Sequence, residues 1–142
     1  MLSEQTLRDA ETPIEACIAR GVQPTTAESL TGGPIAAALT SVAGSSAVVD
    51  RGFVVYSNDA KHRMLGVSTQ AIQEYGAVSE PVAKAMAEGA LERSRARIAI
   101  AVASLAQRGQ PTATATHMFP GERTAIRAAT AAQAFAAIRA RV

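Results

Sequence analysis

The chain has 142 residues, of which 48% are hydrophobic and 4% aromatic, and its formal net charge is only +2. This length predicts a single domain, 1–142, with a substantial core. The scarcity of aromatic residues argues against nucleic acid as a partner, because such surfaces alternate basic and aromatic side chains. The apolar runs are too short to span a membrane, so a membrane is not an expected partner either.

The N-terminus is polar and acidic and lacks the apolar core of a signal peptide. The single Cys17 cannot form an internal disulfide. Together these features predict a cytoplasmic protein. We expect Cys17 to be a buried hydrophobic residue, as most lone cysteines are.

Helical spacing of apolar residues begins near Leu7 and ends at Gly21, a natural C-cap. Thr12, Pro13 and Glu15 have the pattern of a capping box. Either a new helix starts at Thr12 or a longer one kinks at Pro13. A short strand is expected next, at 22–27.

The loop after that strand, TTAESLTGGP at 25–34, gathers hydroxyls, one acid and two glycines ahead of a predicted helix at 34–42. Pro34 suits a first helical turn, and Thr31 or Gly32 is the expected N-cap. Backbone N–H groups would then converge at the positive end of a helix dipole, where a phosphate, a carboxylate or an oxyanion is stabilised. Ser29 lies beside this point. An ordinary turn with a hydroxyl cap is the alternative.

The stretch 47–56 has the β-branched and aromatic content of a strand, interrupted by a bulge or bend at 50–52. Ser57, Asn58 and Asp59 are expected to end this strand and to start a short helix that runs to Leu65. Lys61 lies just past this strand end, where ligands bind in open α/β folds. Partial burial would lower its pKa and make it a base; a solvated lysine is the alternative.

Further along, Gly76 closes a helical piece, Ser79 caps the next helix, and 98–102 reads as a buried strand. A last helix is expected from Arg123 to Arg139. This alternation predicts an α/β domain with three layers. The residues around His62 and His117 show no metal-ligand pattern, so no metal is expected. A Ser-His-Asp triad is possible in principle, although each histidine is expected at the surface.

The motif at 25–33 resembles the TAESCTGG signature of the CinA C-terminal domain family. The resemblance covers residues 3 to about 102, then 118 to the end. Further matching segments follow in the family's order, at 42–46, 51–61, 65–67, 76–82 and 119–123.

This resemblance implies a three-layer α/β/α sandwich with a mixed, mostly parallel sheet. Stand-alone members of the family are serine amidohydrolases that convert nicotinamide mononucleotide to nicotinate mononucleotide and ammonia, without metal or cofactor. Carried over by position, Ser29 is the nucleophile and Lys61 its general base, while Tyr56 and Ser46 relay or orient the proton. The family also implies a homo-oligomer, a dimer or a tetramer.

The same resemblance implies a substrate site for a pyridine nucleotide. Backbone N–H groups of the loop would hold the oxyanion or the phosphate, and a guanidinium would pair with the phosphate. The implied binding residues are Leu30, Thr31, Gly32, Gly33, Asn58 and Arg123.

The chain departs from the family in two places. Leu30 stands where the family has cysteine, a change without effect on the implied nucleophile. The segment 103–118 is shortened and has lost the family's glycine-rich run, with only Gly109 left. One or two strands are expected to be shortened or missing, although 112–116 alternates like an edge strand.

Three functions therefore stay open. In the first, the chain is an active or narrowed amidohydrolase, because Ser29, Ser46, Tyr56 and Lys61 are all present. Alternatively, it is an inactive paralogue that binds a nucleotide or a protein. A third interpretation is a structural paralogue that only assembles with other chains, which would cover sheet exposed by a lost hairpin.

Overall fold

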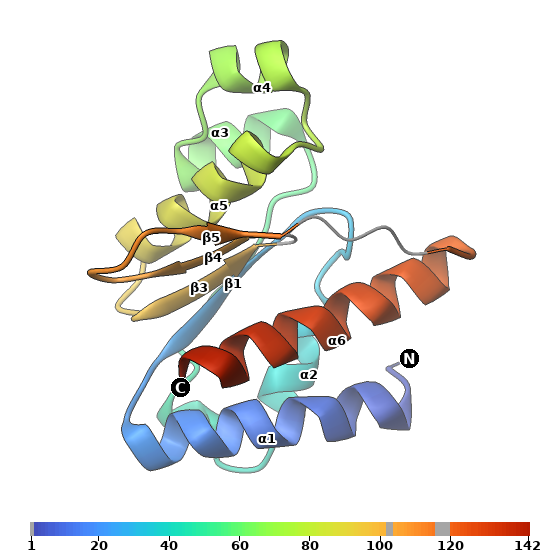
Figure 1. The fold of residues 1–142 in the computed structure, drawn as a ribbon, viewed down its shortest axis with the longest axis vertical. Coiled ribbons are helices and arrows are strands. Elements are labelled where there is room, and N and C mark those ends of the chain that lie inside the picture. Colours follow the sequence, from blue (N-terminus) through green and yellow to red (C-terminus); the bar gives the residue numbers. More distant parts are fainter. Residues whose placement is uncertain (1, 102–103, 116–119) are drawn as a thin grey trace.

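The computed structural model describes residues 2–101, 104–115 and 120–142, which build a five-stranded sheet covered by helices on both faces (Figure 1). The strand order is β2-β1-β3-β4-β5. The first three are mutually parallel, whereas β4 is antiparallel to β3 and to β5. The predicted three-layer α/β architecture is confirmed. The strands are β1 (Pro24–Glu28), β2 (Gly52–Val54), β3 (Ile98–Ala101), β4 (Ser104–Gln107) and β5 (Ala113–Thr114).

Helices lie on both faces of the sheet, some against the strands and the others against neighbouring helices (Figure 1). One layer contains α1 (Glu4–Arg20), α2 (Pro34–Ser41) and α6 (Arg123–Arg141). The other contains α3 (Asn58–Leu65), α4 (Thr69–Tyr75) and α5 (Glu80–Glu92). A short 3₁₀ helix, η1 (Ser45–Ala47), follows α2. Within the described ranges, no helix is both long and apolar enough to cross a membrane.

Two hydrophobic clusters fill the space between the layers, and β3 separates them. Ile98 and Ile100 belong to the cluster beneath α1, α2 and α6, while Ala99 and Ala101 face α5. This division follows from the alternation of side chains along a strand. All of β1 is buried, as expected for a central parallel strand with both faces covered.

The N-terminal segment forms one continuous helix. α1 is capped by Ser3, whose hydroxyl accepts from the Thr6 N–H, and it contains Pro13 in its interior. The longer of the two predicted helices is therefore correct, and the capping box at Thr12 is wrong. Buried apolar residues on both sides of Pro13, Ala10 and Ile14 among them, hold the helix together through packing.

The predicted strand at 47–56 is largely wrong, since only Gly52–Val54 forms a ladder. Val48 and Val49 both donate their N–H to the Ser45 carbonyl, which keeps this part of the chain turned on itself. Their side chains join the core beside α2. The β-branched content of this stretch reflects burial rather than strand pairing.

Most of the other predicted helix ends agree with the structure. Ser57 caps α3 by accepting from the Ala60 N–H, and Gly76 ends α4. Ser79 occupies the N-cap of α5, but its hydroxyl donates to the Gly76 carbonyl instead. The expected strand at 112–116 is reduced to the two residues of β5, and Thr116 lies outside the described residues. Cys17 is buried as predicted, and burial raises its pKa to about 11.

Candidate functional site

Strands β1 and β2 deliver Ser29 and Tyr56 to the same edge of the sheet. Glu28 pairs with Val54, and the Val55 N–H donates to the Glu28 carbonyl at 2.8 Å. Ser29 directly follows β1, and Tyr56 follows Val55, two residues past the end of β2. They therefore leave the sheet side by side at its carboxyl edge, where α/β folds bind ligands.

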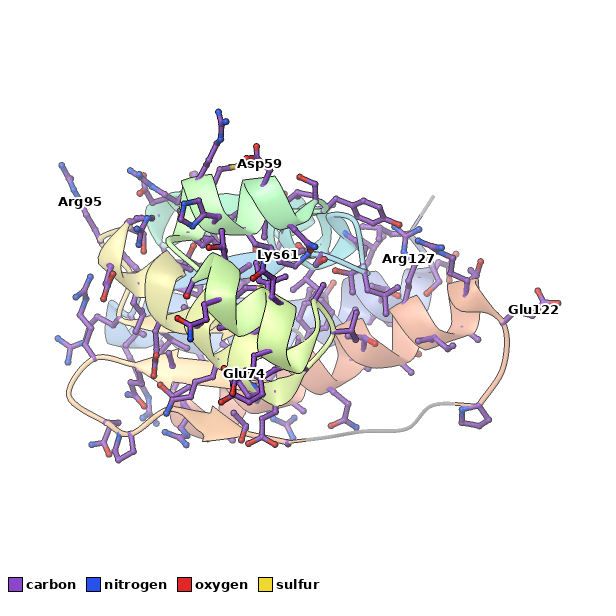
Figure 2. All side chains as sticks on the ribbon, turned by 90° about the horizontal axis from the view of Figure 1, so that it is seen from above. Asp59, Lys61, Glu74, Arg95, Glu122 and Arg127 are labelled. Atoms are coloured by element: carbon purple, nitrogen blue, oxygen red, sulfur yellow. The ribbon has the colours of Figure 1, made fainter. Side chains whose placement is uncertain are left out.

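Lys61 is a buried residue of α3. Its side chain is 2% exposed, and Nζ donates to the Tyr56 carbonyl at 3.4 Å. Figure 2 shows Lys61 within the molecule, whereas the labelled Asp59 and Arg95 project outward. Burial lowers the pKa of Lys61 from its ordinary value of 10.5, and the charge of Tyr56 opposes that shift. The solvated lysine considered from sequence is thus excluded.

This lowered pKa predicts a pH-dependent stability. Between the folded-state pKa of Lys61 and 10.5, the unfolded chain binds more protons, so stability rises with pH across that window. Lys61→Met removes the titrating group. We expect the unfolding free energy of the wild type, minus that of Lys61→Met, to be flat at low pH and to rise toward pH 10.5.

Chemical denaturation of both proteins from pH 6 to 11 measures this difference. Cys17 has its own raised pKa, but it is present in both proteins and cancels. A difference that stays constant over the whole range would contradict the lowered pKa of Lys61.

The N-terminus of α2 is occupied by the chain's own carboxylate. Glu28 is 0% exposed and accepts from the N–H groups of Gly33, Ile35 and Ala36 at 3.2, 3.0 and 2.8 Å. The N-cap is Gly33, so the predicted caps Thr31 and Gly32 are wrong. A buried acid reaching over from β1 satisfies the helix end instead.

Few loop amides remain for a ligand. The Gly33 N–H is bonded to Glu28, and the Gly32 N–H donates to the Ser29 carbonyl at 3.0 Å. The N–H groups of Leu30 and Thr31 have no hydrogen-bond partner within the described part of the chain. The Thr31 hydroxyl is buried and likewise has no partner there. From the sequence, oxyanion donors are expected at Leu30 to Gly33. Of these, only the N–H groups of Leu30 and Thr31 remain available for a ligand.

Ser29 borders a cavity of about 450 Å³. Its walls come from the start of α5, from β3 to β5 and from α6, and they are mostly apolar. Ile100, Met86 and Ala134 contribute to this lining. Ser104 adds a buried hydroxyl without a partner among the described residues. The space beside the candidate nucleophile is therefore large enough for a flat ring and has mostly apolar walls.

Two arginines of α6 reach the same edge. Arg123 donates from Nη2 to the Tyr56 hydroxyl at 2.5 Å. One turn on, the Arg127 guanidinium lies over Gly32, because a Cβ built on that glycine would be 3.0 Å from Arg127 Nη2. Sequence reasoning missed Arg127. Its spacing of four from Arg123 on a predicted helix was a usable signal, since i and i+4 share a helix face.

Ser46 is not gathered with Ser29, whereas Asn58 follows Tyr56 by two residues on the side of the sheet where Ser29 lies. Ser46 lies in η1, at the end of α2 opposite Gly33, and an eight-residue helix is about 12 Å long. A Cβ on the neighbouring Gly44 would lie 3.6 Å from Ile18, near the end of α1. This is the amino edge of the sheet. Asn58 is exposed at the first residue of α3.

The segment 103–118 lines the cavity through Ser104, Ala113, Thr114 and Ala115, but its Gly109 does not take part. β4 starts at the carboxyl edge with Ser104 and runs away from it, so Gly109 lies in the turn at the opposite edge. His62 is exposed, with Nδ1 2.9 Å from the Val67 carbonyl oxygen, and His117 lies outside the described residues. Across the described ranges, no three His, Cys, Asp or Glu side chains gather as a metal site would need.

A family model for the CinA C-terminal domain matches residues 8–107. The chain belongs to this family. Nicotinamide-nucleotide amidohydrolase PncC of Enterobacter agglomerans is 50% identical over 106 residues, which are 74% of this chain and 65% of that enzyme. PncC of Escherichia coli K12 is 46% identical over 106 residues, which are 75% of this chain and 64% of that protein. The chain thus spans slightly less than two thirds of the length of these curated relatives.

Solved structures of the CinA superfamily share the whole architecture. The competence/damage inducible protein CihA from Agrobacterium tumefaciens has a TM-score of 0.92 and 39% identity, covering 99% of this chain and 97% of that one. A CinA superfamily protein from Escherichia coli has a TM-score of 0.88 and 28% identity, covering 100% and 94%. The shortened segment has therefore not changed the fold of this family member.

Proposed function

We propose that this CinA-family chain is an amidohydrolase that deamidates nicotinamide mononucleotide to nicotinate mononucleotide and ammonia. The observation that carries this proposal is the buried Lys61 at the edge where Ser29 leaves β1. A lowered pKa increases the neutral fraction of Lys61, which is the form that acts as a base. The name of the PncC relatives supports the same reaction and substrate.

The proposed reaction has two halves. Ser29 Oγ attacks the carboxamide carbon while its proton passes to neutral Lys61 Nζ, and the oxyanion is held by the Leu30 and Thr31 N–H groups. Ammonia leaves with the proton returned by Lys61. Water then attacks the ester, Lys61 again accepting a proton, and carboxylate and free serine are formed. Tyr56, held by Arg123, orients the lysine side of the site.

Ser46 is left out of this mechanism, because the chain places it at the other edge of the sheet. The proposal includes a cytoplasmic setting and a homo-oligomer, as the family resemblance implies. An inactive paralogue that binds a nucleotide remains the second candidate. It is favoured by the lost glycine-rich run, which leaves Gly109 far from the site.

Incubation of the purified protein with nicotinamide mononucleotide separates these two functions. We expect ammonia and nicotinate mononucleotide to be released in equal amounts, at a rate proportional to enzyme concentration. Heat-denatured protein is the control. A rise in melting temperature with the nucleotide but no ammonia, at high enzyme concentration and long times, would instead establish the binding paralogue.

A further inference from the structure

Arg127 lies against the backbone of the Ser29 loop. Its Nη2 would be 3.0 Å from a Cβ on Gly32, so the guanidinium fills the space that any other residue's side chain would take. The side chain is half-buried and comes from α6 (Figure 2). Gly32 has a φ of +75°, which also favours glycine. The loop is thus shaped to let a cation approach its backbone.

This guanidinium has no acidic partner within the described residues. The ion pairs of that part of the chain are all on other side chains, and they lie at the surface. Glu28, the acid of the loop motif, has both carboxylate oxygens bonded to N–H groups of the α2 end. A half-buried cation without a counter-ion is an incomplete site, because burying a lone charge is unfavourable.

The guanidinium of Arg123, unlike that of Arg127, already has a hydrogen-bond partner within the described residues. Its Nη2 is bonded to the Tyr56 hydroxyl, so it positions that side chain. Of the two arginines, Arg127 is therefore the one that lies at the Ser29 loop without a hydrogen bond or ion pair of its guanidinium within the described residues. A guanidinium fork matches the oxygens of a phosphate and binds it in two parallel hydrogen bonds.

We propose that Arg127 binds the phosphate monoester of the substrate and selects phosphorylated nucleotides over the corresponding nucleosides. This inference rests on the proposed function. It orients the substrate, with the phosphate toward Gly32 and the carboxamide ring toward Ser29 and the apolar cavity. It also explains why the loop needs glycine at position 32.

The test compares nicotinamide mononucleotide with nicotinamide riboside, which lacks the phosphate. In Arg127→Ala, kcat/KM for the nucleotide should fall about 10- to 100-fold, mainly through KM, because a charge-assisted contact is lost. For the riboside, kcat/KM should change less than about twofold. Arg127→Lys should recover part of the loss. Arg139→Ala, an exposed arginine of the same helix, is the matched control and should keep the wild-type preference.

A glycine pair tests the geometry independently. Gly32→Ala and Gly109→Ala both place alanine at positive φ, +75° and +78°, but only the first meets Arg127. We expect Gly32→Ala to raise KM for the nucleotide and Gly109→Ala to leave it unchanged. Equal KM values in both variants, or equal losses on nucleotide and riboside in Arg127→Ala, would overturn the inference.

Calorimetric titration with nicotinamide mononucleotide and with inorganic phosphate separates this inference from the proposed function. If the wild type binds them without turnover and Arg127→Ala does not bind, Arg127 is the phosphate site and the amidohydrolase is rejected. If turnover is present but the preference for phosphate survives in Arg127→Ala, the inference fails alone. No binding of either compound by the wild type overturns both.

Discussion

Replacing Ser29 with alanine should lower kcat for nicotinamide mononucleotide by at least about 10³-fold, because no ester can form without the hydroxyl. The Kd for the nucleotide should change less than about threefold, since the proposed phosphate and ring contacts are kept. Ser29 is half-buried and makes no side-chain hydrogen bond within the described residues, so the fold should not depend on it. Single-turnover ammonia release and calorimetry measure the two quantities.

Ser46→Ala is the matched control, because it makes the same chemical change at the opposite edge of the sheet. We expect near wild-type turnover in that variant. The kcat of Lys61→Met should fall nearly as far as that of Ser29→Ala. The kcat of the double variant should fall little further, since nucleophile and base act as a unit. Full activity in Ser29→Ala would remove the proposed nucleophile, and a large loss in Ser46→Ala would return that residue to the mechanism.

Removing the carboxylate of Glu28 should have the largest effect on stability. Glu28→Ala leaves the N–H groups of Gly33, Ile35 and Ala36 without their acceptor at the end of α2. We expect a loss of about 3 kcal/mol or more in unfolding free energy, because buried unsatisfied donors are costly and a helix N-terminus favours negative charge. Denaturant unfolding followed by circular dichroism measures this loss.

Glu74→Ala is the control for Glu28, since Glu74 is an exposed residue of α4 (Figure 2). The unfolding free energy of Glu74→Ala should differ from that of the wild type by no more than about 0.5 kcal/mol. Glu28→Gln keeps one acceptor oxygen, so its loss of unfolding free energy should lie between those of Glu28→Ala and Glu74→Ala. A loss below about 1 kcal/mol in Glu28→Ala would show that water replaces the carboxylate, contrary to its complete burial.

The elements that sequence predicts well have local causes. Ser57 and Gly76 mark helix ends through hydrogen bonds within a few residues. The position of Lys61 near the edge of the sheet follows from its place just after a strand. Its burial does not, because that depends on how α3 packs.

The remaining features depend on contacts between segments far apart in the chain. Glu28 has the same local pattern whether it faces solvent or bonds to the next helix, so its role as the cap of α2 could not be read from sequence. Arg127 reaches Gly32 only because α6 packs back beside α2. Val48 and Val49 favour a strand locally, but the turn at Ser45 buries them in another way.

The bond between Arg123 and Tyr56 joins residues 67 positions apart, and β1 pairs with β3 across a comparable stretch of chain. Such distant contacts form late in folding, after the entropy of closing long loops has been overcome. During synthesis, the site around Ser29 and Lys61 at the carboxyl edge of the sheet is therefore complete only after α6 has packed. A truncated chain lacking α6 should therefore retain neither a folded site nor partial activity, and the protein should be inert until its C-terminal helix has docked.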